Sequence, residues 1–294
     1  MEMVIMNKKG LTISIILEAE SANYGDSIRN SSVLKKIVRK DNKNYSYISR
    51  QALRYSIVKL LGWDNTPIEA KGSGSQKVAQ FAPDATIKEY PEIDLFGYMK
   101  TSEGDSANTR NAVVRLSNAI SLEEYKGDTD YLTNMGLAKR KNLDNSIVKS
   151  EIHRSLYGYT ISIDLDLVGI DKETEISNEE KAKRINDFLE AVEYLYRDIR
   201  GRRENLAPVF VIGGIYNRKN PYFEHRLSLK KNDLNLSAIK DILIDEEVKK
   251  NTSVGVLKGI FNNEEEIIRD LNAKTIKGVF DELEGKVNEY YQSN

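Results

Sequence analysis

The chain contains no cysteine and only two histidines, and these absences exclude several kinds of site. Without cysteine there are no disulfides and no thiolate metal ligands, which fits a reducing cytosol. His153 and His225 alone provide too little material for a histidine-rich metal centre or a Ser–His–Asp triad. We therefore expect neither a resident metal nor any other cofactor.

Long apolar runs are also missing. No run approaches the roughly 20 residues that cross a bilayer, and the start MEMVIMNKKG lacks the pattern of a signal peptide. The 294 residues are 40% hydrophobic and 30% charged, which is typical of a folded globular protein. We expect a cytoplasmic protein with no membrane partner, built as one elaborated domain or two small ones.

Net charge is nearly absent, at −1, but the charges are unevenly distributed along the chain. Residues 25–59 carry nine Lys or Arg against two Asp, a net charge of +7. Residues 197–231 carry nine more against three acidic residues, a net charge of +6. Two basic segments in a near-neutral chain predict one polyanion-binding surface assembled from both. Scattered surface charge is the alternative.

The segment SRQALRYSIVKLLG (49–62) predicts an amphipathic helix with a serine at its N-cap. Its apolar face consists of Leu53, Ile57, Leu60 and Leu61. Its first turns carry Ser49, Arg50, Gln51 and Arg54. Because free backbone N–H groups at a helix start attract anions, this end is predicted to bind phosphate. An ordinary amphipathic helix with a solvated polar side is the alternative that this segment alone leaves open.

Hydrophobic periodicity predicts an ordered series of strands and helices. The expected elements are a half-buried strand at 11–18, the helix at 49–62, a strand at 111–120, a strand at 156–169, a helix at 178–200, a hairpin of strands at 207–216 and 222–229, and a helix at 275–291. An irregular region (63–106) follows the first helix, and residues 127–146 form an excursion. This order predicts an α+β fold of ferredoxin-like or RRM-like arrangement with a long insertion.

Three sets of residues suggest nucleic-acid chemistry. Alternation in 156–169 places Asp164 and Asp166 together on an outward face, where they could hold Mg²⁺ for phosphodiester cleavage or simply be solvated. Outward carboxylates would repel a phosphate backbone, so RNA is expected along helix ends and loops instead. Asp26 is a loose candidate for a cleaving aspartate, with a turn residue as the alternative. The hairpin tip carries Tyr216, Tyr222 and Phe223 beside Arg218 and Lys219, which suits either wedging against bases or simple packing.

Six motifs follow one another along the chain: AESANYGDSIR (19–29), SRQALRYSIVK (49–59), DLFGYM (94–99), NAVVRLSNAISL (111–122), TDYLTNMG (129–136) and SLYGYTISIDLDLVGI (155–170). Their order resembles the repeated backbone subunit of type I CRISPR effector complexes, the Cas-seven family, in its DevR branch from type I-B systems. The likeness spans roughly residues 8–230 and leaves the C-terminal part uncovered.

The resemblance implies a subunit shaped like a right hand. Its RRM-like palm would comprise residues 1–62 and 109–230, with fingers inserted at 63–108. A thumb hairpin would lie at about 200–230, and residues 231–294 would form a C-terminal extension. Copies would stack head to tail as a filament along one CRISPR RNA. They would present this guide for pairing with target DNA alongside other Cascade subunits, without cutting RNA themselves.

The resemblance also implies RNA-binding positions. At the helix start these are Ser49, Arg50, Gln51 and Arg54, supported by Asn23 and Arg29; in the thumb they are Arg200, Arg202, Arg203, Arg218 and Lys219. Two alternatives stay open. One is an RNA endonuclease related to type III backbone subunits, which would use an aspartate and magnesium. The other is a regulatory protein that binds duplex nucleic acid, suggested only by the DevR label.

Overall fold

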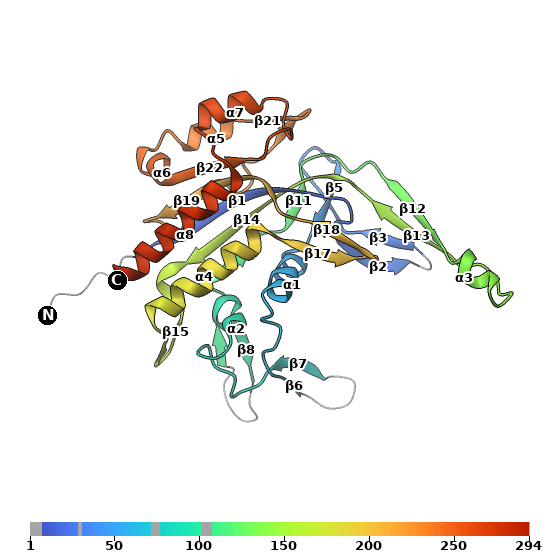
Figure 1. The fold of residues 1–294 in the computed structure, drawn as a ribbon, viewed down its shortest axis with the longest axis horizontal. Coiled ribbons are helices and arrows are strands. Elements are labelled where there is room, and N and C mark those ends of the chain that lie inside the picture. The colour runs from blue at the N-terminus through green and yellow to red at the C-terminus, as the bar shows by residue number, and fades with distance from the viewer. Residues whose placement is uncertain (1–7, 29–30, 72–76, 102–107, 294) are drawn as a thin grey trace.

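The computed structural model describes residues 8–28, 31–71, 77–101 and 108–293. Their main feature is an eight-stranded sheet (Figure 1). Its strands run in the order β22 (Thr252–Val256), β19 (Pro208–Tyr216), β1 (Gly10–Ala19), β14 (Ser155–Asp164), β11 (Ala119–Ser121), β5 (Asn44–Ile48) and β4 (Lys36–Val38), with β10 (Val114–Leu116) also paired to β14. Within the described ranges, no helix has the length and hydropathy that a membrane-spanning segment needs.

The central strand β1 is buried on both faces, whereas alternation predicted a half-buried strand. It pairs antiparallel with β14 along its whole length and with β19 on the other side. Its polar residues are accommodated by bonding across the sheet, as the 2.7 Å hydrogen bond between Ser14 Oγ and Thr160 Oγ1 illustrates. Buried polar groups need such partners, so the face of the sheet that carries Ser14 can be covered by further structure.

Three helices cover one face of the sheet: α1 (Arg50–Leu60), α4 (Asn178–Glu193) and α8 (Ile276–Gln292) (Figure 1). Their apolar sides join the strands in one core cluster, in which Leu53, Phe188 and Phe280 are fully buried. The predicted helix at 178–200 was too long, because α4 ends at Glu193. Residues beyond it form the hairpin of β17 (Tyr196–Ile199) and β18 (Arg202–Asn205).

The opposite face is covered by the C-terminal part of the chain. It contributes β20 (Leu229–Lys230), β21 (Asp233–Leu234), α5 (Ser237–Ile242), α6 (Glu246–Asn251) and α7 (Glu264–Leu271). The predicted strand at 222–229 was wrong. Residues 222–225 form turns, and Phe223 is buried with Phe210 and Ile212 in a second core cluster. Turning the chain there allows Phe223 to enter the core, which an exposed hairpin would not.

Two projections extend from this body (Figure 1). The fingers region contains β6 (Ile68–Lys71), β7 (Val78–Phe81), α2 (Pro91–Phe96), β8 (Tyr98–Lys100) and β9 (Asn108–Arg110). The second projection, which we call the arm, consists of β12 (Asp128–Thr133), α3 (Met135–Lys139) and β13 (Ile147–Ile152). At its base β13 pairs with β3 (Ser31–Leu34), which pairs with β2 (Tyr24–Ile28).

One buried carboxylate fastens the fingers region to the body. Asp94 of α2 is 0% exposed and accepts hydrogen bonds from Arg184 Nη1 at 2.9 Å and Arg110 Nη2 at 2.6 Å. It also accepts from Gly169 N at 2.9 Å, in the loop that follows η2 (Leu165–Leu167) and leads into the small hairpin of β15 (Ile170–Asp171) and β16 (Thr174–Glu175). Because Arg184 belongs to α4, this cluster joins the fingers region to the helical layer.

Candidate nucleic-acid interface

The start of α1 is fixed by internal hydrogen bonds. Ser49 is the N-cap, and its Oγ accepts from Ala52 N at 3.3 Å and donates to Asn23 Oδ1 at 2.6 Å. Arg50 N donates to Asn118 Oδ1 at 2.9 Å. The resemblance implies that Ser49 contacts the guide and that Asn23 supports this contact; the structure places the two side chains within hydrogen-bond distance of each other. The side-chain oxygens of Ser49 and Asn23 already have protein partners, so both residues stabilise the start of the helix.

The next two side chains of α1 point to solvent. Arg50 and Gln51 are exposed, and neither side chain forms an ion pair or hydrogen bond with another described residue. The first turn carries no acidic residue. A helix start has free N–H groups and a positive partial charge, so an unpaired guanidinium and amide there form an anion-attracting end.

Arg54 stands one turn further along and is partly engaged. Its Nη2 lies 3.3 Å from Glu92 Oε1, its guanidinium carbon lies 4.8 Å from the centre of the Phe96 ring, and its side chain is 35% exposed. A groove of about 420 Å³ runs beside it. The residues that line this groove are Arg50, Gln51, Arg54, Phe96, Ala112, Val114, Arg115 and Leu116. We call it the α1 groove.

Arg115 was not among the predicted site residues, although the structure brings it into the α1 groove. It is the only charged residue in the predicted strand NAVVRLSNAI. That isolated charge was the signal that could have found it. Residues 111–120 form two short strands, β10 and β11, rather than one. A neighbouring hollow of about 460 Å³ shares Arg54 and Phe96 with the groove and continues into the fingers region.

The arginines at 200–203 lie in the hairpin that replaces the end of the predicted helix. Arg200 has φ 51° and Gly201 has φ 76°, a turn that ends β17 and starts β18. All three guanidiniums have internal partners: Arg200 with Ser150 Oγ at 2.5 Å and the Tyr24 ring at 4.0 Å, Arg202 with Glu204 at 3.1 Å, and Arg203 with Asp198 at 2.9 Å. Arg200 joins the hairpin to the base of the arm, whereas Arg203 pairs within the hairpin. RNA binding by them stays a prediction.

Glu204 is the buried acid of this hairpin. It accepts from Ser21 N at 2.9 Å and Glu20 N at 2.8 Å and pairs with Arg197 at 2.7 Å. Burial by itself would raise the pKa of Glu204, but Arg197 and the two backbone N–H groups outweigh it and hold the pKa below its usual value. The ionised form is therefore favoured by the fold.

Glu204→Gln should destabilise the protein by about 3 kcal/mol at pH 7, because it leaves Arg197 without its buried partner. The folded-state pKa lies below the unfolded value of about 4.3. The ionised Glu204 carboxylate therefore stabilises the folded state fully above the unfolded-state pKa, and this stabilisation is lost as the pH falls through the folded-state pKa. Urea unfolding of the two proteins should differ at pH 7 and converge below about pH 4. An equal difference at both pH values would contradict this assignment.

The acidic pair Asp164 and Asp166 is not the solvated strand face that alternation predicted. The strand ends at Asp164, and η2 returns Asp166 beside it while Leu167 becomes 42% exposed. Both residues are buried, with 8% of each exposed. Lys219 pairs with Asp166 and lies 3.7 Å from Asp164, and Arg115 lies 2.8 Å from Asp164. Their charges are compensated by two cations.

The remaining predicted residues that the structure describes do not line the α1 groove. Arg218 is exposed and has no ion pair with another described residue. Tyr216 and Phe223 are each 2% exposed, so of the two alternatives for these aromatic residues the structure shows packing. Tyr222 packs on Tyr216 with ring centres 4.9 Å apart. Arg29 and the side chain of Asp26 lie outside the described residues.

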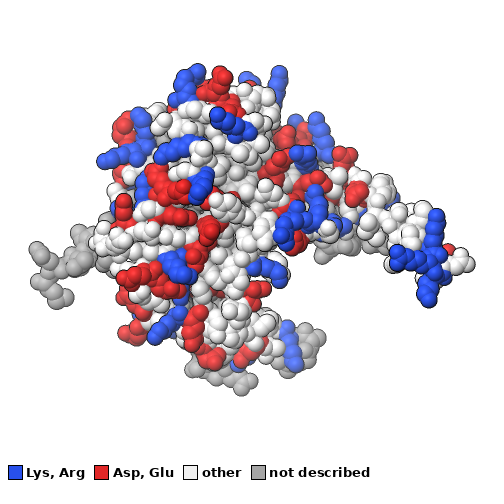
Figure 2. All heavy atoms as spheres, in the orientation of Figure 1, with Lys and Arg blue, Asp and Glu red and all other residues white. Residues whose placement is uncertain are grey.

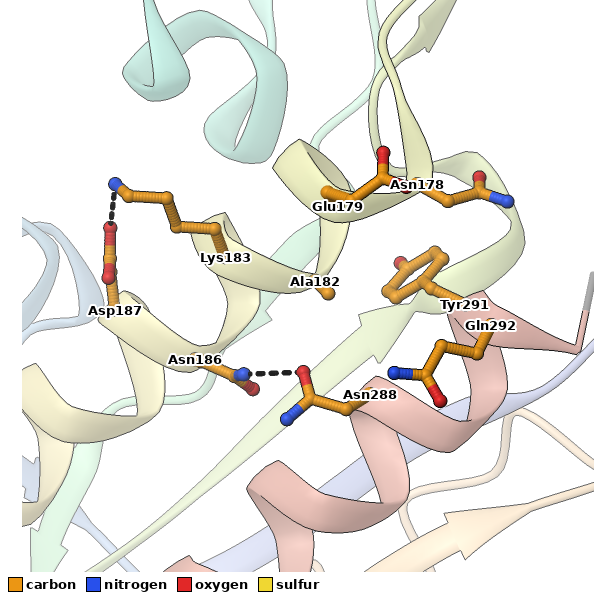
Figure 3. A pocket seen from close by; sticks show the side chains of 9 residues that line it. All are labelled: Asn178, Glu179, Ala182, Lys183, Asn186, Asp187, Asn288, Tyr291 and Gln292. Atoms are coloured by element: carbon orange, nitrogen blue, oxygen red, sulfur yellow. Dashed lines mark hydrogen bonds and ion pairs between the residues drawn. The ribbon is translucent and has the colours of Figure 1, made fainter.

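No group of three or more His, Cys, Asp or Glu suited to a metal occurs in the described part of the chain. A hollow of about 660 Å³ lies between α4 and α8, and four of its nine lining residues carry side-chain amides (Figure 3). Asn186 Nδ2 donates to Asn288 Oδ1 at 2.9 Å across it, and its lysine, Lys183, is paired with Asp187 at 2.9 Å. It therefore offers no free cation for phosphate, unlike the α1 groove.

A family model described as "CRISPR-associated negative auto-regulator DevR/Csa2" matches residues 11–233. The chain belongs to the DevR/Csa2 family. This DevR/Csa2 protein matches no curated protein. The resemblance seen in the motifs is thereby confirmed at the level of the family.

Solved structures show where this mixed α and β fold occurs. One, described as a "CRISPR RNA-guided surveillance complex, pre-nicking", is 12% identical with a TM-score of 0.58, and the match covers 95% of this chain and 100% of the other. Another, described as a "CRISPR RNA-guided surveillance complex", is 14% identical with a TM-score of 0.52, covering 87% and 92%. At these identities the likeness establishes the fold of this DevR/Csa2 protein.

Two of the matched motifs have structural roles that sequence reasoning missed. DLFGYM supplies Asp94, which fastens the fingers region, and SLYGYTISIDLDLVGI supplies Gly169 N to the same carboxylate. Gly169 has φ 69° and little space for a Cβ, which suits glycine. In this DevR/Csa2 protein, Asp94 and Gly169 therefore have structural roles, whereas Phe96 of DLFGYM lines the α1 groove.

Proposed function

We propose that this chain is a guide-RNA-binding backbone subunit of a Cascade-like CRISPR surveillance complex. The observation that carries the proposal is the α1 groove, where unpaired Arg50 and Gln51 stand beside Arg54 and Arg115 at a helix start. Membership of a CRISPR-associated family supports it. The type I-B assignment and a cytoplasmic location are part of the proposal.

An RRM-like palm is supported by the order and direction of the strands. The path β19–β1–β14 with β10 and β11 is antiparallel throughout, and α1 and α4 pack on one face. This corresponds to the strand order of a ferredoxin-like fold. The opposite face, which many RRMs use for RNA, is covered over β19 and β22 by the C-terminal helices. RNA would therefore follow the helix start and the adjoining fingers region.

The chemistry of the groove suits a strand held by its backbone. Guanidinium and amide donors at a helix start contact phosphates without distinguishing bases. A guide held in this way keeps its base edges free to pair with target DNA. Each chain would make only a few contacts, so stable retention would require several copies along one RNA.

The arm is our candidate for the element that reaches over the strand toward a neighbouring copy, in place of residues 200–230. Large apolar side chains are exposed along it: Tyr131, Leu132, Met135, Leu137, Leu143 and Ile147. Its far end is basic (Figure 2), where Lys139, Arg140 and Lys141 follow one another. Exposed apolar residues gathered on a projection are typical of an interaction surface. A head-to-tail contact that does not close would produce a filament.

We also propose that the subunit is not catalytic. The compensation of Asp164 and Asp166 by Lys219 and Arg115 supports this, because a carboxylate pair that binds Mg²⁺ needs free charge. Other subunits of the complex would then carry out any cleavage of the target.

The protein should bind single-stranded RNAs of unrelated sequence with similar affinity and a steep dependence on salt, because it contacts phosphates. Fluorescence anisotropy measures both. On a long RNA, light scattering after size exclusion should detect complexes that grow in steps of one 33.4 kDa chain. Sequence-specific binding to duplex DNA would instead favour a regulator. Regularly spaced cuts in complementary RNA with Mg²⁺ would favour an endonuclease.

A further inference from the structure

We infer that Arg115 is an additional phosphate ligand of the α1 groove, positioned by Asp164, and that Lys219 compensates Asp164 when Arg115 turns to RNA. This inference rests on the proposed function and extends it to a residue on a different element. Arg115 lies on β10, whereas Arg50 and Arg54 lie on α1.

The strand exposes Arg115 at the groove, whereas Val114 is buried and Leu116 is partly buried. Val114 is 1% exposed in the core, whereas the Arg115 side chain is 49% exposed. The pairing of Arg115 with Ser162 in the β10–β14 register fixes its backbone. Alternation along β10 therefore turns this guanidinium away from the core that Val114 enters.

The carboxylate beside Arg115 holds it at the edge of the groove. Asp164 Oδ2 lies 2.8 Å from Arg115 Nη2, and its side chain is 11% exposed. Asp164 has a second cation, because Lys219 Nζ lies 3.7 Å from its other oxygen. Removing the only partner of a buried carboxylate is costly, but here Lys219, which also pairs with Asp166, stays beside Asp164 when Arg115 moves. Asp164 and Asp166 would then share Lys219, and the phosphate would replace the carboxylate as the partner of Arg115.

A guanidinium suits this exchange because its donors match a carboxylate and a phosphate in the same bidentate geometry. With Arg115 on one wall and Arg50 and Arg54 on the other, a phosphate chain in the groove would be held from two elements. Arg54 likewise has a carboxylate partner, Glu92, at 3.3 Å. Arg54 and Arg115 would therefore both exchange a carboxylate for a phosphate.

The test compares Arg115→Ala with Arg269→Ala, a control arginine that is exposed and paired with Asp270 at 2.7 Å on α7. Affinity for a fluorescein-labelled single-stranded RNA should fall about tenfold in Arg115→Ala, the loss of one charge-assisted contact. The log–log salt slope should become shallower by about 0.7. Arg269→Ala should match the wild type, and Arg115→Lys should recover part of the affinity. Thermal unfolding by circular dichroism establishes that each variant is folded.

A second measurement addresses Lys219. Lys219→Met leaves Arg115 as the remaining cation beside Asp164, so Arg115 should stay with Asp164 and be less available to RNA. The substitution should therefore lower RNA affinity in the wild-type protein but cause no further loss in Arg115→Ala. Unchanged affinity of Arg115→Ala, with weakened binding by Arg50→Ala/Gln51→Ala, would overturn this inference and leave the proposed function intact. Unchanged affinity in both would overturn the proposed function itself. An equal loss in Arg269→Ala would overturn the specific role of Arg115.

Discussion

Replacing Asp94 with alanine is expected to lower the free energy of unfolding by about 3–5 kcal/mol. Asp94 is the anion that compensates Arg184, whose side chain is 2% exposed, and Arg110, whose side chain is 7% exposed. Alanine would leave both guanidiniums buried beside an empty space. Arg184 would keep its bonds to the Ile87 and Lys88 carbonyls and a single carboxylate partner, Glu180, which is 40% exposed. Arg110 would lose the carboxylate with which it forms its ion pair.

Urea unfolding followed by circular dichroism measures this change. Asp187→Ala provides the control, because Asp187 lies on the same helix as Arg184 and its partner Lys183 is 66% exposed. An exposed pair of that kind contributes at most about 1 kcal/mol. If the two variants lost equal stability, Asp94 would not be the fastening that holds the fingers region to the body.

The double variant Arg50→Ala/Gln51→Ala is expected to lower the affinity for single-stranded RNA about 100-fold. Each change removes a donor that has no partner among the described side chains, and one contact to a charged group contributes about 1.5 kcal/mol or more. The fold should be unaffected, since both side chains are exposed and alanine favours helix. The salt slope should become shallower by about 0.7, because one cation is lost.

Anisotropy titrations at several salt concentrations measure both quantities. Arg269→Ala/Gln292→Ala removes the same two residue types from the C-terminal half and should bind like the wild type. Retention of wild-type affinity by Arg50→Ala/Gln51→Ala would exclude the α1 groove as the RNA site. A loss of affinity with an unchanged salt slope would mean that the contact is not to phosphate.

Much of the α1 groove could be predicted from the sequence because the information is local. Ser49 before a helical repeat of apolar residues specifies where α1 begins, and Arg50, Gln51 and Arg54 follow from that start. Contacts between residues that are far apart in the sequence could not be predicted. Arg115 joins the groove only because β10 pairs with β14 beside α1, and its partner Asp164 is 49 residues away.

In the second basic segment (197–231), a local excess of positive charge did not predict which cations are free. Its positive charge suggested free ligands for RNA. In the fold, Arg197 and Arg202 compensate Glu204, and Lys219 compensates Asp166. Composition counts charges, whereas the availability of a charge depends on which acid the tertiary structure brings within a few ångströms.

The sequence by itself determined the family, the helix that begins after Ser49 and the apolar strands, because each of these depends on residues close together in the chain. Only the tertiary structure decided which cations are free. It paired Asp164 with Arg115 and Lys219, buried Phe223, and directed the chain after Glu193 into a hairpin. The physical reason is that a buried charge must find its counter-ion wherever the fold places one, and that distance in space is not written in local patterns.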